Sequence, residues 1–109
     1  MAYDEALADR VRSQLARKRG LSERKMFGGL AFMLQGNMCC GVIKDELMVR
    51  VGADGQDDAL AQPHARPMDF TGRPMKGMIY VEAAGLRTDA ALGAWVARGV
   101  AFTRTLPAK

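Results

Sequence analysis

The stretch LAFMLQGNMCCGVIKDELMVRV, residues 30–51, decides the fold of this chain. Its apolar segments are separated by two short polar breaks, Gly36-Asn37 and Lys44-Asp45-Glu46. Glycine and asparagine tolerate positive φ, which the tight turn of a β-hairpin requires. The stretch therefore predicts three sequential strands, over residues 30–34, 38–43 and 47–51, joined as an antiparallel meander.

The segment before this meander predicts a helix over residues 3–19 and a further strand. One face of the helix carries an apolar residue at every fourth position, at Tyr3, Leu7, Val11 and Leu15. Acidic residues begin the segment and basic residues end it, which suits the helix dipole, and Gly20 is expected to cap the helix in the left-handed conformation. Residues 23–27 fit a fourth strand, which Gly28-Gly29 interrupts.

The segment after the meander predicts a short helix followed by two strands. The helix falls within residues 52–62, where Asp54 or Gln56 could cap it, and Pro63 ends it. The strands are expected over residues 68–70 and 75–81, on either side of the turn Thr71-Gly72-Arg73-Pro74.

The last helix is expected to begin after Thr88, a favourable N-cap residue. Its apolar stripe contains Leu92, Trp95, Val96, Gly99, Phe102 and Leu106. Gly99 has no side chain, so it predicts a close approach of the helix to the sheet. The whole order, α-β-β-β-α-β-β-α, predicts an α+β fold: an antiparallel sheet of about five strands with flanking N- and C-terminal helices and one short middle helix. A single domain spans residues 1–109.

Composition and targeting signals favour a reducing cytoplasm. The N-terminus is polar and acidic, so no signal peptide is expected, and no apolar run reaches the ~20 residues needed to cross a membrane. The two cysteines, Cys39 and Cys40, are adjacent. We expect their side chains on opposite faces of a strand, without a structural disulfide. A net charge of +4 permits an acidic partner or nucleic acid.

The residue types that catalysis or metal binding would need do not gather in the sequence. His64 is the sole histidine, and Cys39-Cys40 lacks the spacing with which two thiolates hold zinc. No serine or acidic residue can be assigned a catalytic partner. We therefore expect no enzyme activity, no catalytic residue, no metal and no cofactor.

Two glycine-bearing segments carry cations beside apolar residues: Lys25-Met26-Phe27-Gly28-Gly29 and Gly72-Arg73-Pro74-Met75-Lys76-Gly77. A rigid scaffold presents binding surfaces on constrained loops of this kind. We interpret Lys25, Arg73 and Lys76 as contacts to an acidic partner or ligand. The structural residues are Met26, Phe27, Gly28, Gly29, Gly72, Pro74, Met75 and Gly77, which set the path of the backbone and fasten it to the core.

These segments give the chain a resemblance to a family. With an amphipathic first helix and a last helix that bears Trp95, the motifs KMFGGLAF (25–32), LMVRVG (47–52) and TGRPMKG (71–77) resemble the N-terminal domain of TfoX/Sxy proteins over nearly the whole chain. The family's named members are bacterial regulators of natural competence that act with the cyclic-AMP receptor protein at promoters, and none is known as an enzyme. Full-length regulators carry a second, helical domain, so this chain is expected to be a stand-alone N-terminal domain.

The resemblance implies a non-enzymatic regulatory domain that binds a protein partner, such as a transcription factor of the cyclic-AMP receptor protein type. Two other functions stay open. The basic surface could bind nucleic acid directly, or Gly28-Gly29 with Arg73 and Lys76 could hold a phosphate or another small ligand. Formation of a homodimer also stays open, because a sheet with helices on one face can leave its other face partly apolar.

Overall fold

A computed structural model describes residues 3–26, 28–70 and 73–107; for Met26, 68–70 and 73–76 it describes the backbone alone. The elements follow the order α1 (Glu5–Leu15), β1 (Leu21–Met26), β2 (Gly29–Leu34), β3 (Asn37–Ile43), β4 (Glu46–Arg50), α2 (Gln56–Leu60), β5 (Ala65–Phe70), β6 (Arg73–Val81) and α3 (Asp89–Thr103). A 3-10 helix over Ala83–Leu86, which the sequence analysis did not predict, joins β6 to α3.

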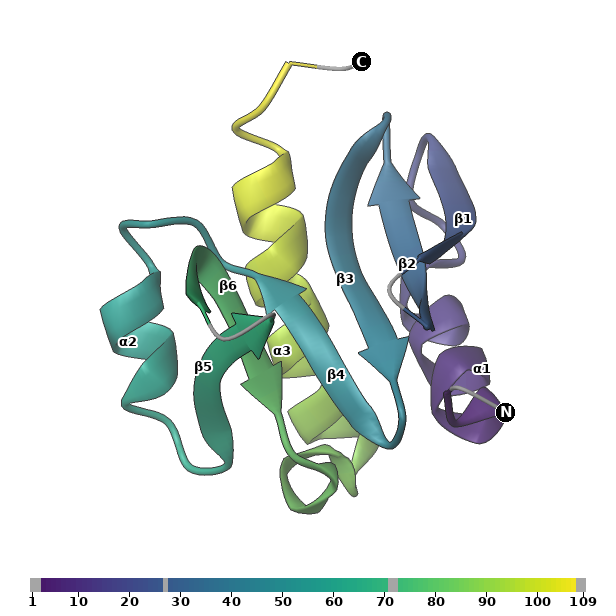
Figure 1. The fold of residues 1–109 in the computed structure, drawn as a ribbon. Coiled ribbons are helices and arrows are strands. Elements are labelled where there is room, and N and C mark those ends of the chain that lie inside the picture. The colour runs from purple at the N-terminus through teal and green to yellow at the C-terminus, as the bar shows by residue number, and fades with distance from the viewer. Residues whose placement is uncertain (1–2, 27, 71–72, 108–109) are drawn as a thin grey trace.

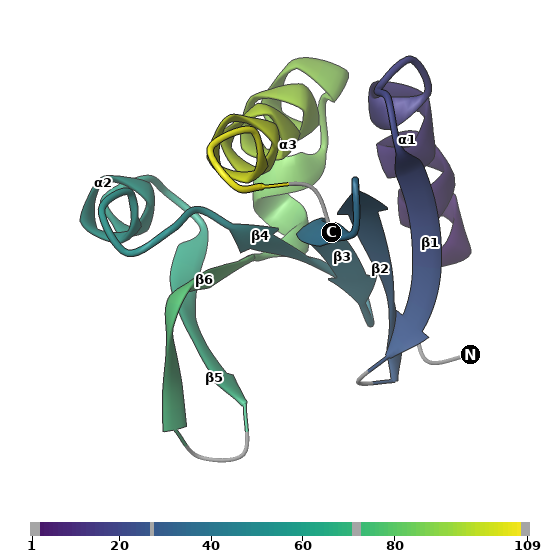
Figure 2. The same ribbon diagram turned by 90° about the horizontal axis from the view of Figure 1, so that it is seen from above.

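The strands form one antiparallel sheet in the order β1-β2-β3-β4-β6-β5. The helices α1 and α3 lie side by side on one face of it, and the β5–β6 hairpin bends away from them (Figures 1 and 2). The predicted α+β class is confirmed, with six strands where about five were expected. The sixth is β1, because residues 21–26 pair with β2 along their whole length.

The first helix is shorter than predicted. It begins after Asp4, whose Oδ1 accepts a hydrogen bond from the Leu7 N–H at 3.1 Å, and it ends at Leu15. Tyr3 therefore lies outside the helix, where it forms an isolated bridge with Lys44. Gly20 does have positive φ, but it opens the turn into β1 rather than capping α1, so that prediction was wrong.

Two predicted turn and cap positions are shifted by one residue. The β2–β3 turn uses Gln35 and Gly36, whose φ values are 53° and 84°, whereas Asn37 is buried in β3. The Asn37 side chain donates to the carbonyl oxygen of Pro107 at 2.9 Å, a tertiary contact that local sequence cannot show. Gly55, and neither Asp54 nor Gln56, occupies the N-cap position of α2.

The start of the last helix is confirmed. The Thr88 hydroxyl oxygen accepts a hydrogen bond from the Ala91 N–H at 3.0 Å, which caps α3. Gly99 faces the sheet so closely that an added Cβ would lie 2.6 Å from the Cys39 carbonyl oxygen. The helix ends at Thr103, so Leu106 lies beyond the apolar stripe predicted for it.

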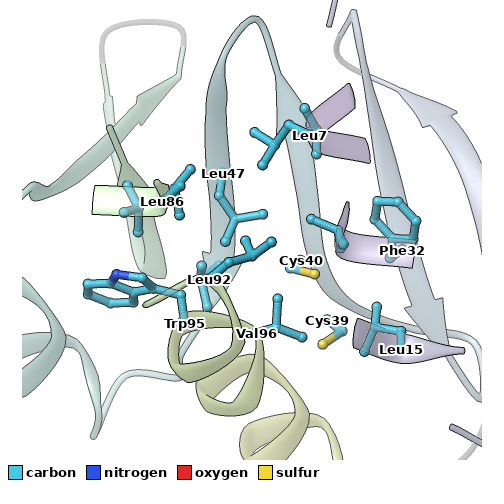
Figure 3. Packing of buried hydrophobic residues seen from close by; sticks show 14 of the residues in the cluster. Leu7, Leu15, Phe32, Cys39, Cys40, Leu47, Leu86, Leu92, Trp95 and Val96 are labelled. Atoms are coloured by element: carbon cyan, nitrogen blue, oxygen red, sulfur yellow. The ribbon is translucent and has the colours of Figure 1, made fainter. Parts of the chain in front are cut away.

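The main hydrophobic core lies between the sheet and the helices α1 and α3 (Figure 3). Its largest fully buried side chains include Leu15, Phe32, Leu47 and Leu92. A second, smaller cluster of Met48, Met78 and Tyr80 lies on the opposite face of the sheet, with the partly buried Met38 and Ile43 packed against it. The strands β4 and β6 are thus apolar on both faces.

The two cysteines lie on the same face of the sheet, contrary to our prediction. Phe32 pairs with Cys40 and Met33 pairs with Met38, so Cys39 is an extra residue in a β-bulge. The bulge interrupts the alternation of side chains along β3. Both cysteines are 0% exposed within the main core, and neither forms a disulfide (Figure 3).

Candidate functional site: the β1 edge of the sheet

The structure separates the two cationic segments that the sequence analysis selected. Lys25 lies on β1, at one edge of the sheet, whereas Arg73 and Lys76 lie on β6. The strands β2, β3 and β4 come between them. Phe27 and Gly72 lie outside the described residues, as do the side chains of Met26, Arg73, Pro74, Met75 and Lys76.

Three described glycines of the two segments, Gly28, Gly29 and Gly77, have positive φ or pack closely against a neighbouring strand. Gly28 has a φ of 74°, and a Cβ at Gly29 would lie 2.3 Å from the Val42 carbonyl oxygen on β3. Gly77 has a φ of 87°, its N–H donates to the Gln56 side chain at 2.8 Å, and its carbonyl accepts from the Val51 N–H at 2.9 Å. Gly29 thus allows the start of β2 to lie close to β3, and the hydrogen bonds of Gly77 fasten β6 to Gln56 of α2 and to the segment that follows β4.

The β1 strand forms an exposed edge of the sheet. Residues 22–25 are all exposed, and β1 pairs with β2 on one side only. The outward backbone groups of such a strand can pair with a further strand. Arg24 and Lys25 are neighbours on β1, so their side chains leave opposite faces of the strand.

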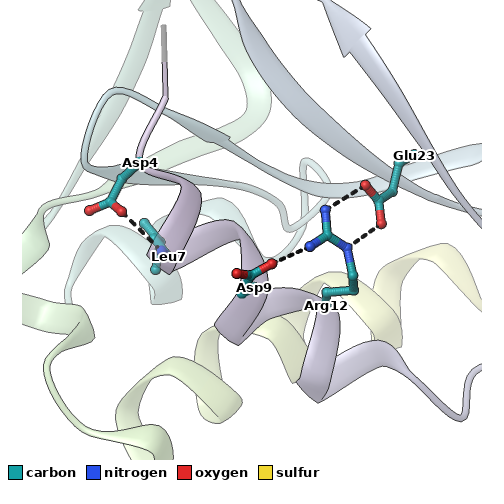
Figure 4. A network of polar contacts seen from close by, with 5 residues as sticks. All are labelled: Asp4, Leu7, Asp9, Arg12 and Glu23. Atoms are coloured by element: carbon teal, nitrogen blue, oxygen red, sulfur yellow. Dashed lines mark hydrogen bonds and ion pairs between the residues drawn. The ribbon is translucent and has the colours of Figure 1, made fainter. Parts of the chain in front are cut away.

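The acidic residue of β1 is already paired. Glu23 makes a two-pronged contact with the Arg12 guanidinium of α1, through Nε at 2.5 Å and Nη2 at 2.7 Å, and Arg12 also binds Asp9 (Figure 4). The hydrogen bond from Arg12 lowers the pKa of Glu23, and the same bond raises the pKa of Arg12. Glu23 is therefore committed to α1 and does not neutralise the cations beside it.

Three other arginines of the described residues also have acidic partners. Arg10 and Arg98 pair with Asp89 and Asp58, and Arg66 pairs with Glu46 at 2.5 Å. In contrast, neither Arg24 nor Lys25 has an acidic partner among the residues that the structure describes. Both cations of β1 are thus available to a molecule that approaches the edge.

A cross-strand row extends from the β1 edge over the face of the sheet that α1 and α3 leave uncovered. Its members pair in sequence across all six strands: Arg24, Ala31, Gly41, Met48, Tyr80 and Arg66. Met48 lies over Gly41, where an added Cβ would be 2.7 Å from the Met48 Cε. At the far end the Arg66 guanidinium carbon lies 4.5 Å from the centre of the Tyr80 ring. An arginine therefore stands at both ends of an apolar row.

A second basic group lies where α1 and α3 end. Lys18, Arg19 and Arg104 line a hollow of about 150 Å³ beside Leu34 and Val100. Cations at helix C-termini interact favourably with the helix dipoles, so this group has a structural role of its own.

The sequence analysis missed a larger cleft of about 540 Å³ between the α2–β5 connection and α3. Its lining comes from three separate segments, at residues 62–64, 84–88 and 91–98. The sequence holds only a weak indication of this cleft: Trp95 and Arg98 are one turn apart on α3, and the sole histidine, His64, follows Pro63.

Among the described residues, no three histidine, cysteine, aspartate or glutamate side chains are grouped so that they could hold a metal ion. None of the described helices has both the length and the apolar character that crossing a membrane requires.

The comparison with protein families gives one match. The family described as the TfoX N-terminal domain matches residues 13–103, which include every strand and all of α3. No curated protein and no solved structure matches the chain.

Proposed function

The chain belongs to the TfoX N-terminal domain family, and from that premise we propose that it is a non-enzymatic regulatory domain that binds an acidic, extended segment of a protein partner at β1. The observation that carries the proposal is the exposed edge strand with two cations that lack acidic partners among the described residues. A partner strand would pair with the outward backbone groups of β1, and acidic side chains on its two faces would meet Arg24 and Lys25.

The family resemblance extends this proposal to a pathway. We propose that the partner is a transcription factor of the cyclic-AMP receptor protein type, that the domain acts in the regulation of competence, and that it does so in the cytoplasm. Arg73 and Lys76 remain proposed as further contacts, on a separate part of the sheet.

Charge reversal at the edge tests the proposal. The double variant R24E/K25E keeps a charged edge that resists sheet-to-sheet aggregation, but it repels an acidic segment. Binding of the purified cyclic-AMP receptor protein, measured by biolayer interferometry, is expected to be lost. The matched control is R17E/R19E, which changes the net charge equally but lies outside β1. Equal losses in both variants would mean that net charge, and not the β1 edge, governs binding.

A photo-crosslinking residue placed at Ser22 locates the contact. Ser22 is exposed on β1, whereas Ala101 is exposed on α3 and serves as the control position. The proposal predicts a cross-linked partner from position 22 that is absent from position 101 and disappears in R24E/K25E. A cross-link that survives the charge reversal would contradict the assignment of β1.

The basic group at the ends of α1 and α3 favours a second candidate function, the binding of nucleic acid phosphates. Titration of duplex DNA at several salt concentrations tests it. An affinity that falls steeply with salt and is lost in R17E/R19E would support this function. No affinity at low salt, or an affinity that ignores salt, would exclude it.

A further inference from the structure

The cleft between the α2–β5 connection and α3 has the size of a small-molecule site. Its volume of about 540 Å³ falls within the usual range for such sites, roughly 300–1,000 Å³. Its lining comes from the connection between α2 and β5, from the segment between β6 and α3, and from α3 itself; Figure 2 shows α3 above the sheet, with α2 beside the start of β5. The β1 edge is at the opposite end of the sheet, so the cleft is a separate surface from the one proposed to bind the protein partner.

One wall of the cleft is apolar. The Trp95 ring lies there beside Ala91 and Ala94 on the same face of α3. Trp95 is 7% exposed, so its ring is held firmly by the core and presents only a margin to the cleft. No described residue accepts a hydrogen bond from its indole N–H. This wall offers an apolar surface to a bound ring.

The charged side chains that line the cleft are both arginines. Arg87, Arg98 and His64 all line it, and none of the described lining residues is acidic. The Arg98 guanidinium carbon lies 5.3 Å from the centre of the Trp95 ring, and its Nη1 donates to Asp58 at 2.8 Å. Arg98 is thus positioned by two contacts and partly neutralised. Arg87 is exposed and has no acidic partner among the described residues, so its charge is available to an anion.

The backbone at His64 is held in an unusual conformation at the mouth of the cleft. Its φ is 70°, and its carbonyl oxygen accepts a hydrogen bond from the Glu82 N–H at 2.9 Å. Gly85 makes this possible, because a Cβ there would lie 2.8 Å from the His64 Cβ. A left-handed conformation in a residue other than glycine is strained and persists only where its surroundings enforce it. Contacts from residues 82–85 therefore fix the backbone of His64 at the cleft.

We propose that this cleft binds a small organic anion with a planar apolar body. The body lies against Trp95 and the alanines of α3, and the anionic group, a phosphate or a carboxylate, is bound by Arg87 with His64 beside it. Arg98 orients the indole ring and completes the positive surroundings.

Two-dimensional NMR of the full chain tests this proposal. Trp95 is the sole tryptophan, so it gives a single indole N–H signal. Phenyl phosphate is the probe, benzyl alcohol supplies the ring without the charge, and inorganic phosphate supplies the charge without the ring. Phenyl phosphate is expected to shift the indole signal and the amides of Arg87 and Thr88 saturably. It should bind about tenfold more tightly than either control compound, since each control lacks one set of contacts.

The variant R87Q is expected to weaken phenyl phosphate binding about tenfold, the effect of losing one charge-assisted hydrogen bond. H64N retains a residue that tolerates positive φ and removes the imidazole, and it should weaken binding to a smaller extent. The matched control R17Q, an exposed arginine outside the cleft, should bind as the parent does. Equal binding of the three compounds, shifts centred on another surface, or an unchanged affinity in R87Q would each overturn the proposal.

Discussion

The bulge at Cys39 decides the chemistry of the two thiols. Strand alternation alone places neighbouring side chains on opposite faces, and our prediction followed that rule. The pairing of β2 with β3 instead leaves one residue of β3 unmatched, so both sulfurs enter the main core. Register between strands is a tertiary property, and for that reason the local sequence did not reveal it.

Both thiols should resist alkylation in the native protein. The hydrogen bond with Cys39 and complete burial raise the pKa of the Cys40 thiol well above its ordinary value, whereas the hydrogen bond from Cys40 lowers the pKa of the Cys39 thiol. Because both residues are fully buried, the reagent reaches neither sulfur unless the fold opens. Mass spectrometry after treatment with iodoacetamide should show slow labelling at a rate set by opening of the fold, and rapid double labelling in denaturant. Rapid labelling of Cys40 without unfolding would contradict its placement in the core.

The Arg12–Glu23 contact should make a small, pH-dependent contribution to stability. Its side chains are 42% and 32% exposed, so solvent screens the pair, and E23Q is expected to lower the free energy of unfolding by only about 0.5 kcal/mol at pH 7. Because the pKa of Glu23 is lowered in the folded state, the contribution is present above the unfolded pKa.

That contribution should fade as the pH falls through the folded pKa of Glu23. Urea unfolding of the parent and E23Q at a series of pH values measures the difference. The free energies of unfolding of the parent and of E23Q should become equal at acid pH. A difference between them that grows as the pH falls would show that the Glu23 carboxylate does not stabilise the fold.

At the scale of the elements, α3 contains a matched pair of glycines with opposite roles. Gly99 touches the backbone of the β3 bulge, where an added Cβ would lie 2.6 Å from a carbonyl oxygen that cannot move freely. A Cβ added at Gly93 would lie 3.1 Å from its nearest neighbour, the Oε1 atom at the end of the flexible Gln14 side chain. Helix propensity favours alanine over glycine equally at both positions. The packing contacts therefore decide whether each Gly→Ala substitution raises or lowers the stability of the protein.

G99A is expected to destabilise the protein by about 2 kcal/mol, as overpacking against a fixed backbone does. G93A should leave stability unchanged or raise it by up to about 1 kcal/mol. Thermal or urea unfolding of both variants provides the comparison. If G99A were as stable as G93A, that result would contradict the close packing of α3 on β3 at Gly99.

The existence of most elements follows from local patterns, while several of their ends do not. The period of α3 and its cap at Thr88 are local features, and both are confirmed. The strand β3 begins at Asn37, which pairs with Leu34 and whose side chain reaches the distant Pro107 carbonyl, and the N-cap of α2 falls on a glycine with no side chain to mark it. Where a boundary is fixed by a distant contact, sequence alone places it a residue or more away.

At the scale of the whole molecule, strand order decides which predicted site residues can act together. The strand β6 inserts between β4 and β5, although β5 precedes it in sequence. The two cationic segments consequently lie on separate parts of the sheet, a separation that their similar composition did not suggest. The cleft beside Trp95 was equally hidden, because it forms only where three separate segments meet.

Amide hydrogen exchange of β1 tests the central claim most directly. In the free protein, the outward-pointing N–H groups of β1, at alternate residues, should exchange quickly because no strand covers them. When the partner cross-linked from Ser22 is bound, these alternate amides should become protected while the basic ends of α1 and α3 do not change. Unaltered exchange along β1 in the complex, with protection appearing on another surface, would contradict the account.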